Sequence, residues 1–496
     1  MILQEIFYNN FEMIIPEFFL TTILLILLLF GVFYQKNQNI QKILIIKNIT
    51  TIIIYLLLIL LILTSNINIS NTILNGVLII NNFTQFIKII LIVATIICFS
   101  IQQNYLIQQK IAAYEINILI LIALLGLMVL ISSNHLITLY LAVEVQSLSF
   151  YILTATKKKS VLSVEAGLKY FILGSIASCF ILYGSSVIYV ITGSLNFSNI
   201  FLIVSNVNFL ENIDLLISLS YGLIFIFVGL LFKIGASPFH FWLPDVYEGA
   251  PNTVSSFFAI VPKIAFIGVL IRLFFEVFFH ISFFFEVFFY IVSFLSMTIG
   301  AVSSLQQKKI KRLLAYSSIS HTGFILIGFA SNMLNNVPFI LFYVLIYVIT
   351  SINLWTSYLS LNINHKPVKY LTDLANLSSV NQPISVIFSI SIFSLAGIPP
   401  LAGFFSKLFI FFSAIQNNYF SLIFFSLIIS IVSSFYYLKI IKIIYFEKVV
   451  RTLYISQINK LQSIVLMVNS QFVLFLFIFP NFILINLDKI YLSLLI

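Results

Sequence analysis

The sequence is dominated by apolar runs that are each about as long as a membrane is thick. About 20 consecutive apolar residues form a helix that crosses the hydrocarbon core of a bilayer, and fourteen such runs can be placed in the 496 residues. Only 8% of the residues are charged, against about 25% in soluble domains, and no polar stretch is long enough to form a separate soluble domain. We therefore expect an all-α polytopic membrane protein with fourteen transmembrane helices.

Two of these runs are too long for one straight crossing and contain helix-breaking residues. The predicted spans cover residues 14–34, 43–63, 77–99, 116–131, 136–154, 166–191, 215–243, 254–275, 281–302, 313–330, 337–361, 383–415, 420–444 and 464–484. The seventh contains Gly235 to Pro238, and the twelfth contains Gly397 to Pro400. A break inside a membrane is tolerated only where protein or a wet cavity satisfies the freed backbone groups. Spans 7 and 12 are therefore predicted to be broken.

The two breaks indicate an internal repeat. They lie five spans apart, and because five is odd, the repeats must have opposite orientations in the membrane. Paired interrupted helices in two inverted halves point to the ion site of a transporter. We predict an N-terminal three-helix flank (1–112), a first five-helix repeat of spans 4–8 (113–276), a second, inverted repeat of spans 9–13 (277–447) and a C-terminal helix 14 (448–496).

The basic residues predict the orientation of the chain. Loops after odd-numbered spans hold most of the 25 lysines and arginines, including Lys157–Lys159 and Lys308–Arg312, whereas the opposite side has only Arg272 and Lys489. Basic loops stay on the inner side of a membrane, so both termini are predicted on the outer side, where acidic residues such as Glu17 fit. The net charge of +10 then reflects topology and requires no nucleic acid as a partner.

A glutamate and a lysine are predicted to pair within the first repeat. Glu144 lies in the middle of span 5 and is the only carboxylate placed deep in the membrane, and Lys233 lies in span 7. A charge at the centre of a bilayer costs about 2.5–3.5 kcal/mol on insertion scales, and an opposite charge offsets part of that cost. We expect a Glu144–Lys233 contact, direct or through one water, whose strength changes as protons move. A static structural pair is the alternative.

Three further ionisable residues in the spans are predicted to extend a pathway for protons from this pair. Lys263 lies beside Pro262 in span 8, about ten residues from the start of its span, which is too far for its ammonium to reach the interface. Lys407 follows the second break and is, by the repeat, the counterpart of the first-half lysine. His321 lies among hydroxyl residues that could hold water, with a satisfied structural histidine as the alternative. Proton translocation is therefore predicted for Glu144, Lys233, Lys263, His321 and Lys407.

Other polar residues are expected to have structural roles. Lys88, in the middle of span 3, is expected to contact a neighbouring subunit or to extend toward the membrane surface. Asp245 and Glu248 are expected to cap or brace the loop after span 7. Cys98 and Cys179 show no metal-ligand spacing and are expected to be small core residues.

Three sequence blocks resemble the antiporter-like membrane subunits of respiratory complex I, and in particular the subunit 2 branch of that family. The blocks are PFHFWLPDVYEGAP (Pro238–Pro251), AYSSISHTGF (Ala315–Phe324) and SLAGIPPLAGFFSKLFI (Ser394–Ile410). They stand in the family's order, and the resemblance extends roughly from the third span onward. It implies two inverted five-helix bundles, and it assigns to Lys407 proton exchange toward the outer side.

The resemblance also implies a function and a setting. It implies a proton-translocating subunit of NADH:ubiquinone oxidoreductase, with NADH oxidation and quinone reduction carried out by other subunits. NADH, FMN, iron–sulfur clusters and ubiquinone would then belong to the rest of the complex, and no cofactor would be bound by this chain. The implied neighbours are the antiporter-like subunit 4, the small subunit 4L and lipids. The alternative is a subunit of a multi-subunit cation/proton antiporter, whose core motifs would look alike.

The expected location is the mitochondrial inner membrane, with a bacterial plasma membrane as the alternative. The first ten residues lack a basic n-region, so no signal or transit peptide is expected. The sequence is rich in Ile, Phe, Asn, Lys and Tyr, which A+T-rich codons specify. Both features indicate an organellar gene.

Overall fold

The computed structural model describes residues 2–34, 39–67, 71–108, 114–206, 213–363, 366–447, 454–455 and 460–495. These residues form α1 (Ile2–Tyr34), α2 (Asn39–Ser65), α3 (Asn82–Gln108), α4 (Glu115–Ser132), α5 (Leu136–Thr154), α6 (Val161–Thr192), α7 (Phe197–Asn206), α8 (Ile213–Ile234), α9 (Trp242–Gly249), α10 (Asn252–Ile271), α11 (Glu286–Leu305), α12 (Ile310–Ala330), α13 (Val337–Ser360), α14 (Leu377–Val380), α15 (Gln382–Ala396), α16 (Ala402–Gln416), α17 (Phe420–Phe446), α18 (Lys460–Ile478) and α19 (Pro480–Leu495). A π-helix, η1 (Arg272–Val277), and three 3₁₀ segments, η2 (Phe279–Phe285), η3 (Leu334–Asn336) and η4 (Leu371–Leu374), lie between them.

Short strands occur only in connections between helices in the described part of the chain. β1 (Asn71–Ile73) and β2 (Leu78–Ile80) form an antiparallel hairpin before α3. β3 (Leu361–Ile363) pairs antiparallel with β4 (Lys366–Pro367) and with β5 (Tyr454–Ile455). Membrane-crossing segments are therefore helical, as the satisfaction of backbone groups in lipid requires.

The helix pattern confirms the predicted fold class. Thirteen helical segments among the described residues are long and apolar enough to cross a membrane, and each corresponds to one predicted span. The remaining predicted span, the twelfth, is occupied by the two shorter apolar helices α15 and α16. The chain is an all-α polytopic membrane protein.

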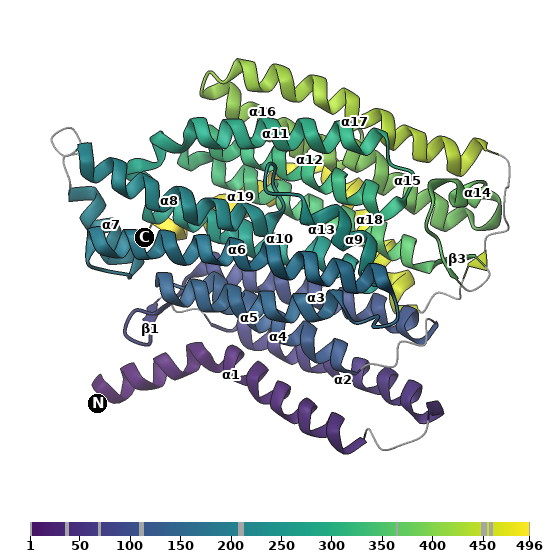
Figure 1. Cartoon of the computed structure of the whole chain (residues 1–496), viewed down its shortest axis with the longest axis horizontal. Coiled ribbons are helices and arrows are strands. Elements are labelled where there is room, and N and C mark those ends of the chain that lie inside the picture. The colour runs from purple at the N-terminus through teal and green to yellow at the C-terminus, as the bar shows by residue number, and fades with distance from the viewer. Residues whose placement is uncertain are drawn as a thin grey trace.

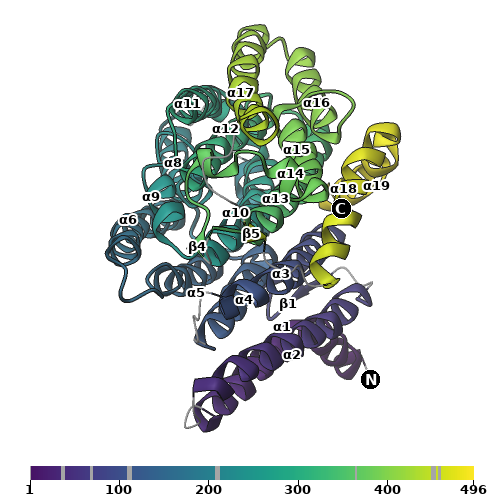
Figure 2. The same ribbon diagram turned by 90° about the vertical axis from the view of Figure 1, so that its right-hand side faces the viewer.

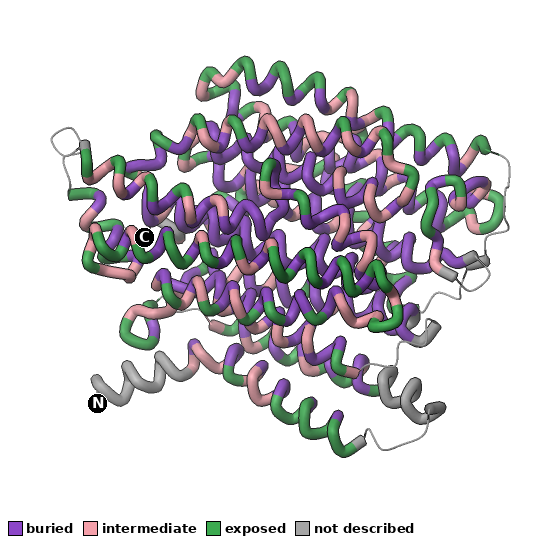
Figure 3. Tube along the Cα trace, in the orientation of Figure 1, coloured by how far each residue is buried: buried purple, intermediate pink, exposed green. Residues whose placement is uncertain are grey.

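The long helices lie side by side in one bundle (Figure 1). Seen end-on, α1 and α2 form one edge of the bundle and α17 lies at the opposite edge (Figure 2). Burial is concentrated between these edges (Figure 3), and every residue of α10 is buried. α1 begins and α19 ends at the same end of the bundle, on the left in Figure 1, and the side of the membrane on which this end lies stays a prediction.

α8 ends earlier than its predicted span. The helix stops at Ile234 because Gly235 adopts a left-handed conformation with φ +80°, which glycine tolerates without a Cβ clash. The indole Nε1 of Trp242 donates to the backbone oxygen of Phe232 at 2.9 Å, so a side chain of the protein satisfies a carbonyl at the helix end. The predicted span 7 runs to residue 243 across its break. In the structure the helical path resumes only with α9 (Trp242–Gly249), which continues through Pro244 instead of turning there.

The end of α15 resembles the end of α8, with a left-handed glycine and a side chain that donates to a terminal carbonyl. α15 stops at Ala396, where Gly397 has φ +83°, and the ammonium of Lys407 on α16 donates to the backbone oxygen of Ala396 at 2.7 Å. A helix C-terminus carries partial negative charge and attracts a cation. The inverted relation of the two halves and the domain limits stay predictions.

Three helices were not expected from the apolar runs. α7 is a short helix after α6, α14 is a single turn before α15, and the predicted fourteenth span (464–484) is divided between α18 and α19. Pro480, which lacks a backbone N–H and favours the first turn of a helix, starts α19.

Candidate functional site

Lys263 lies at the centre of the bundle on α10, where it faces α12 and α13. Its ammonium donates to the backbone oxygen of Ser318 at 3.3 Å and to the hydroxyl of Tyr347 at 3.2 Å, and it lies 4.8 Å from the centre of the Tyr347 ring. The described residues place no carboxylate within 4.0 Å of it. Oxygen atoms and an aromatic face, rather than a counter-ion, therefore surround this cation.

His321 on α12 is held between two tyrosine hydroxyls. Its Nδ1 lies 2.7 Å from the hydroxyl of Tyr343, and its Nε2 lies 3.0 Å from the hydroxyl of Tyr437. One nitrogen of a neutral imidazole donates and the other accepts, and a tyrosine hydroxyl can do both. The ring centre of His321 lies 5.5 Å from that of Tyr347, so Tyr347 contacts both Lys263 and His321.

A small cavity lies between His321 and Lys407. It has a volume of about 10 Å³, and its lining includes Tyr343, Tyr347 and Ser406. A cavity of roughly 10–15 Å³ can hold one water. One water in this cavity would connect the imidazole region to the Lys407 ammonium, which otherwise bonds the end of α15.

Glu144 and Lys233 each contact a hydroxyl group of α5. Ser147 Oγ donates to Glu144 Oε2 at 3.3 Å, and the Lys233 ammonium donates to the Tyr151 hydroxyl at 3.5 Å. Residues 144, 147 and 151 share one face of α5 because they are three and seven residues apart. The ion pairs of the described residues do not include a direct Glu144–Lys233 pair, and their contact, direct or through one water, stays a prediction.

The structure thus assembles the predicted residues in two groups, Glu144 with Lys233 and Lys263 with His321 and Lys407. No hydrogen bond joins Lys233 to Lys263 in the part of the chain that the structure describes. The sequence interpretation missed the tyrosines that link each group. The i, i+4 spacing of Tyr343 and Tyr347 in an apolar helix was a usable signal, since such residues share one helix face.

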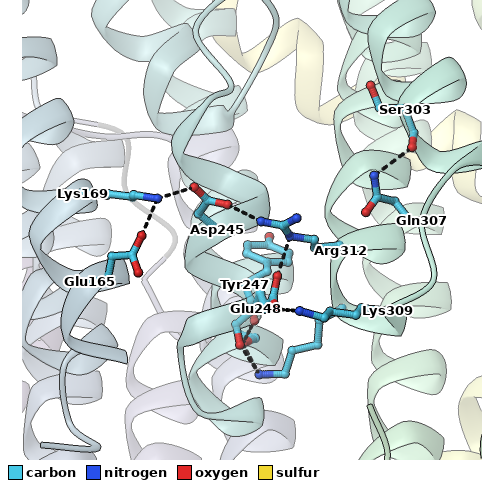
Figure 4. Close-up of polar contacts among 11 residues, drawn as sticks. Glu165, Lys169, Asp245, Tyr247, Glu248, Ser303, Gln307, Lys309 and Arg312 are labelled. Carbon is cyan, nitrogen blue, oxygen red and sulfur yellow. Dashed lines mark hydrogen bonds and ion pairs between the residues drawn. The ribbon is translucent and has the colours of Figure 1, made fainter. Parts of the chain in front are cut away.

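Six charged side chains form a second cluster, which we call the charged mouth. Its residues come from α6, α9 and α12 and line a pocket of about 260 Å³: Glu165, Lys169, Asp245, Glu248, Lys309 and Arg312. Asp245 pairs with Lys169 at 2.9 Å and with Arg312 at 2.7 Å. Glu248 pairs with Arg312 at 2.5 Å and also with Lys309 (Figure 4). Asp245 and Glu248 therefore brace α9, as expected, by tying it to α6 and α12.

These ion pairs also set the protonation of Asp245. Burial by itself would raise the pKa of this carboxyl, but the contacts with Lys169 and Arg312 outweigh burial and lower the pKa below its ordinary value of 3.8. Asp245 therefore stays ionised at neutral pH and holds both cations.

Two expectations about polar residues were wrong, those for Lys88 and for Cys179. Lys88 neither faces a neighbour nor reaches the membrane surface, because its ammonium pairs with Glu17 Oε1 at 2.5 Å and only 3% of the residue is exposed. Glu17 is therefore buried, whereas Glu144 is half-buried. Arg272 is buried and donates to the backbone oxygens of Ile131 and Ser133 at 2.8 and 2.6 Å. Cys98 is buried as expected, but Cys179 is exposed.

Known proteins share both the sequence and the architecture. The family model described as "NADH:quinone oxidoreductase/Mrp antiporter, TM" matches residues 133–435. NADH-ubiquinone oxidoreductase chain 2 of Marchantia polymorpha is 36% identical over 478 residues, which cover 96% of this chain and 97% of the relative. NADH-quinone oxidoreductase subunit N of Paramagnetospirillum magneticum is 35% identical over 431 residues, 86% of each chain.

Two solved structures superpose over nearly the whole chain. A chain of respiratory complex I from Thermus thermophilus with bound Aureothin aligns with a TM-score of 0.77 and 25% identity, over 95% of this chain and 98% of that one. A chain of the Mrp complex from Dietzia sp. aligns with a TM-score of 0.80 and 18% identity, over 98% and 97%, a likeness that shows the fold alone. With its family match across the central helices and its full-length relatives, the chain belongs to the family of membrane proteins that NADH:quinone oxidoreductases and Mrp antiporters share.

Proposed function

We propose that this chain is a proton-translocating membrane subunit of an NADH:quinone oxidoreductase, the respiratory complex I. Relatives that bear this name are 35–36% identical over 86–96% of the chain. The Mrp chain shares 18% identity, so the relatives favour the complex I subunit over the alternative of a multi-subunit cation/proton antiporter. The chain acts as part of the enzyme, with NADH oxidation and quinone reduction carried out by other subunits.

The contact that carries the proposal is the one that Tyr347 makes with both Lys263 and His321. The Lys263 ammonium donates to the Tyr347 hydroxyl, and the Tyr347 ring packs beside His321, whose two nitrogens contact the hydroxyls of Tyr343 and Tyr437. A proton leaving Lys263 would pass among these groups, each of which can donate and accept. The cavity beyond His321 has room for about one water, which would extend the path to Lys407. These three groups form the second half of the proposed pathway.

Glu144 and Lys233 form its first half. Glu144 accepts from the Ser147 hydroxyl and Lys233 donates to the Tyr151 hydroxyl, and these two hydroxyls on one face of α5 would carry the proton between them. Glu144 is only half-buried in the isolated chain, and its position at the chain surface suits a boundary with another subunit. In this proposal the separation of charge between Glu144 and Lys233 controls when Lys263 receives a proton.

The cofactors of the complex, the neighbouring subunits and the membrane location are proposed from the same family. NADH, FMN, iron–sulfur clusters and ubiquinone would be held by other subunits of the complex. A second antiporter-like subunit (subunit 4) and the small subunit 4L would be the membrane neighbours. The location would be the mitochondrial inner membrane or, for a bacterial chain, the plasma membrane, with both termini on the outer side.

The test is Lys263→Ala in the assembled complex. We expect proton pumping and coupled quinone reduction to fall, because Lys263 lies at the centre of the row, while NADH oxidation by an artificial electron acceptor stays near the wild-type rate. Lys158→Ala is the control, since it removes an exposed lysine of the same charge. Normal assembly with an unchanged number of protons pumped per electron would remove Lys263 from the pathway.

A second measurement distinguishes a complex I subunit from a subunit of a cation/proton antiporter. The purified chain should carry flavin, iron–sulfur clusters and NADH-oxidising activity with it in the complex. Co-purification with other antiporter subunits alone, without NADH oxidation, would instead establish the cation/proton antiporter.

A further inference from the structure

Two contacts from one face of α16 hold the break between α15 and α16. The ammonium of Lys407 donates to the backbone oxygen of Ala396, the last residue of α15, at 2.7 Å. The backbone N–H of Gly403 donates to Ser394 Oγ at 3.1 Å. Gly403 and Lys407 share a helix face because they are four residues apart. Of these two contacts, only the one from Lys407 involves a charge that the loss of a proton would remove.

The two helices pack closely around this contact. A Cβ atom on Gly403 would lie 1.8 Å from the backbone oxygen of Ser394, and one on Gly397 would lie 2.9 Å from Lys407 Cδ. Lys407 itself is only 7% exposed. The lysine side chain therefore lies inside the junction of the two helices, where a change in its charge acts directly on the contact between them.

Dipoles and an aromatic ring stabilise the charge of Lys407. The cavity beside its ammonium is lined by three titratable side chains of α12 and α13, namely His321, Tyr343 and Tyr347. In the described structure α17 and α18 also pack against α16 but contribute no residue to this lining, and the ion pairs do not include Lys407. The negative end of α15 and the ring of Phe324, whose centre is 5.1 Å away, are therefore the groups that face the charge.

The corresponding contact at the end of α8 has no charge to lose. There the indole N–H of Trp242 donates to the backbone oxygen of Phe232 at 2.9 Å, and an indole is a neutral donor. The lysine of that helix, Lys233, donates to the Tyr151 hydroxyl on α5 instead. The two breaks therefore differ in kind, since a neutral donor holds the first and an ammonium holds the second.

We propose that Lys407 controls the break between α15 and α16 through its charge. The protonated side chain holds α16 against the end of α15, and loss of the proton loosens the junction, because a charge-assisted hydrogen bond is roughly twice as strong as a neutral one. The proton leaves on the side of the cavity that His321 also lines, and the amine keeps its lone pair, so no group is oxidised or reduced. The proposal rests on the proposed function, in which Lys407 exchanges a proton.

The experiment measures how fast a cysteine in place of Ala402 reacts with a membrane-permeant thiol reagent in the assembled complex. Ala402 is the first residue of α16 and is 0% exposed, so the labelling rate follows the population in which the junction opens. Cys98 and Cys179 are replaced by alanine, and the labelled peptide is quantified by mass spectrometry. Lys407→Met removes the donor and should raise the rate about tenfold or more, as expected for the loss of a hydrogen bond to a charged group. Lys407→Arg keeps a permanent charge, so it should label as slowly as wild type and stop pumping.

The matched control is a cysteine in place of Ala236, which follows Gly235 at the first break and is also 0% exposed. Lys407→Met should leave the labelling rate at this position unchanged, because Trp242 holds the first break. Trp242→Phe should give the opposite pattern, with faster labelling at position 236 and an unchanged rate at position 402.

Three results would overturn the proposal: labelling of Lys407→Met as slow as in wild type, labelling of Lys407→Arg as fast as in Lys407→Met, or wild-type pumping by Lys407→Arg. If Lys407→Met does not assemble, Lys407→Gln replaces it, since glutamine also lacks the charge; labelling as slow as in Lys407→Arg would then overturn the proposal.

Labelling is measured without turnover, so the two proposals can fail separately. Slow labelling of Lys407→Met together with lost pumping in Lys263→Ala would overturn the control of the break and leave the proposed function standing. Fast labelling of Lys407→Met together with normal pumping in Lys263→Ala would support the control of the break by charge and overturn the proposed function.

Discussion

The buried Glu17–Lys88 pair gives a sharp quantitative prediction. Lys88 donates to Glu17 Oε1, while Glu17 Oε2 is buried without a hydrogen-bond partner in the described structure. Removing one member of a buried pair costs about 3–5 kcal/mol, because the other charge stays buried and unpaired. Lys88→Met and Glu17→Gln should each loosen the docking of α1 by about that amount, whereas the double variant should recover most of the loss.

The assay is the labelling rate of a cysteine placed at Leu20, one turn beyond Glu17 on α1 and 1% exposed, with the native Cys98 and Cys179 replaced by alanine. The rate of labelling by a thiol reagent follows the population in which α1 opens locally. A loss of about 3 kcal/mol corresponds to a labelling rate more than a hundredfold higher, since about 1.4 kcal/mol is a factor of ten. Each single variant should show this increase in labelling rate. The increase in the double variant should be far smaller than the product of the two single increases.

The exposed Glu165–Lys169 pair on α6 is the control for this cycle, because both side chains are about half in solvent and such pairs contribute little. Its two single changes should leave the labelling rate of the Leu20→Cys reporter unchanged. Additive effects of Lys88→Met and Glu17→Gln, within about 0.5 kcal/mol, would refute the reasoning, since they would show that the two charges do not depend on each other.

Three further outcomes are expected. Glu144→Gln should lose proton pumping nearly as fully as Glu144→Ala, and Glu144→Asp should keep part of it, because pumping depends on the charge of this side chain. The measurement is the number of protons pumped per electron. Wild-type pumping by Glu144→Gln would show that the Glu144–Lys233 pair is structural. Cysteines in place of Lys158 and Lys308 should react with an impermeant reagent from one side of the membrane and a cysteine in place of Asp214 from the other; opposite labelling of the first two would contradict the fourteen-span topology. The lowered pKa of Asp245 means that its ion pairs stabilise the charged mouth at every pH above 3.8, the ordinary value, and that this stabilisation is lost as the pH falls further. The backbone amide of Ala250, which donates to the Val246 oxygen at 2.9 Å, should therefore lose its protection from hydrogen exchange only in that acidic range, and protection lost already near pH 6 would contradict the assignment.

The sequence by itself determined the membrane crossings and the ends of α8 and α15. Insertion of a helix into hydrocarbon depends on the length and polarity of a continuous segment, so span positions are local properties. The positions of Gly235 and Gly397 are local in the same way, because only glycine adopts a left-handed conformation at little cost. The buried ionisable residues were visible for the same reason, since a lysine in an apolar run stands out against its neighbours.

Only the tertiary structure decided which of these groups meet. Lys88 and Glu17 are 71 residues apart, and Lys263 and Tyr347 are 84 residues apart, so neither contact is encoded in the spacing of one helix. The spacing of tyrosines in an apolar run shows which helix face they share, but it does not show which group each hydroxyl contacts. The partner of each buried charge was therefore fixed by how α1, α3, α10, α12 and α13 pack against one another, and packing between distant helices is the part that a linear sequence does not state.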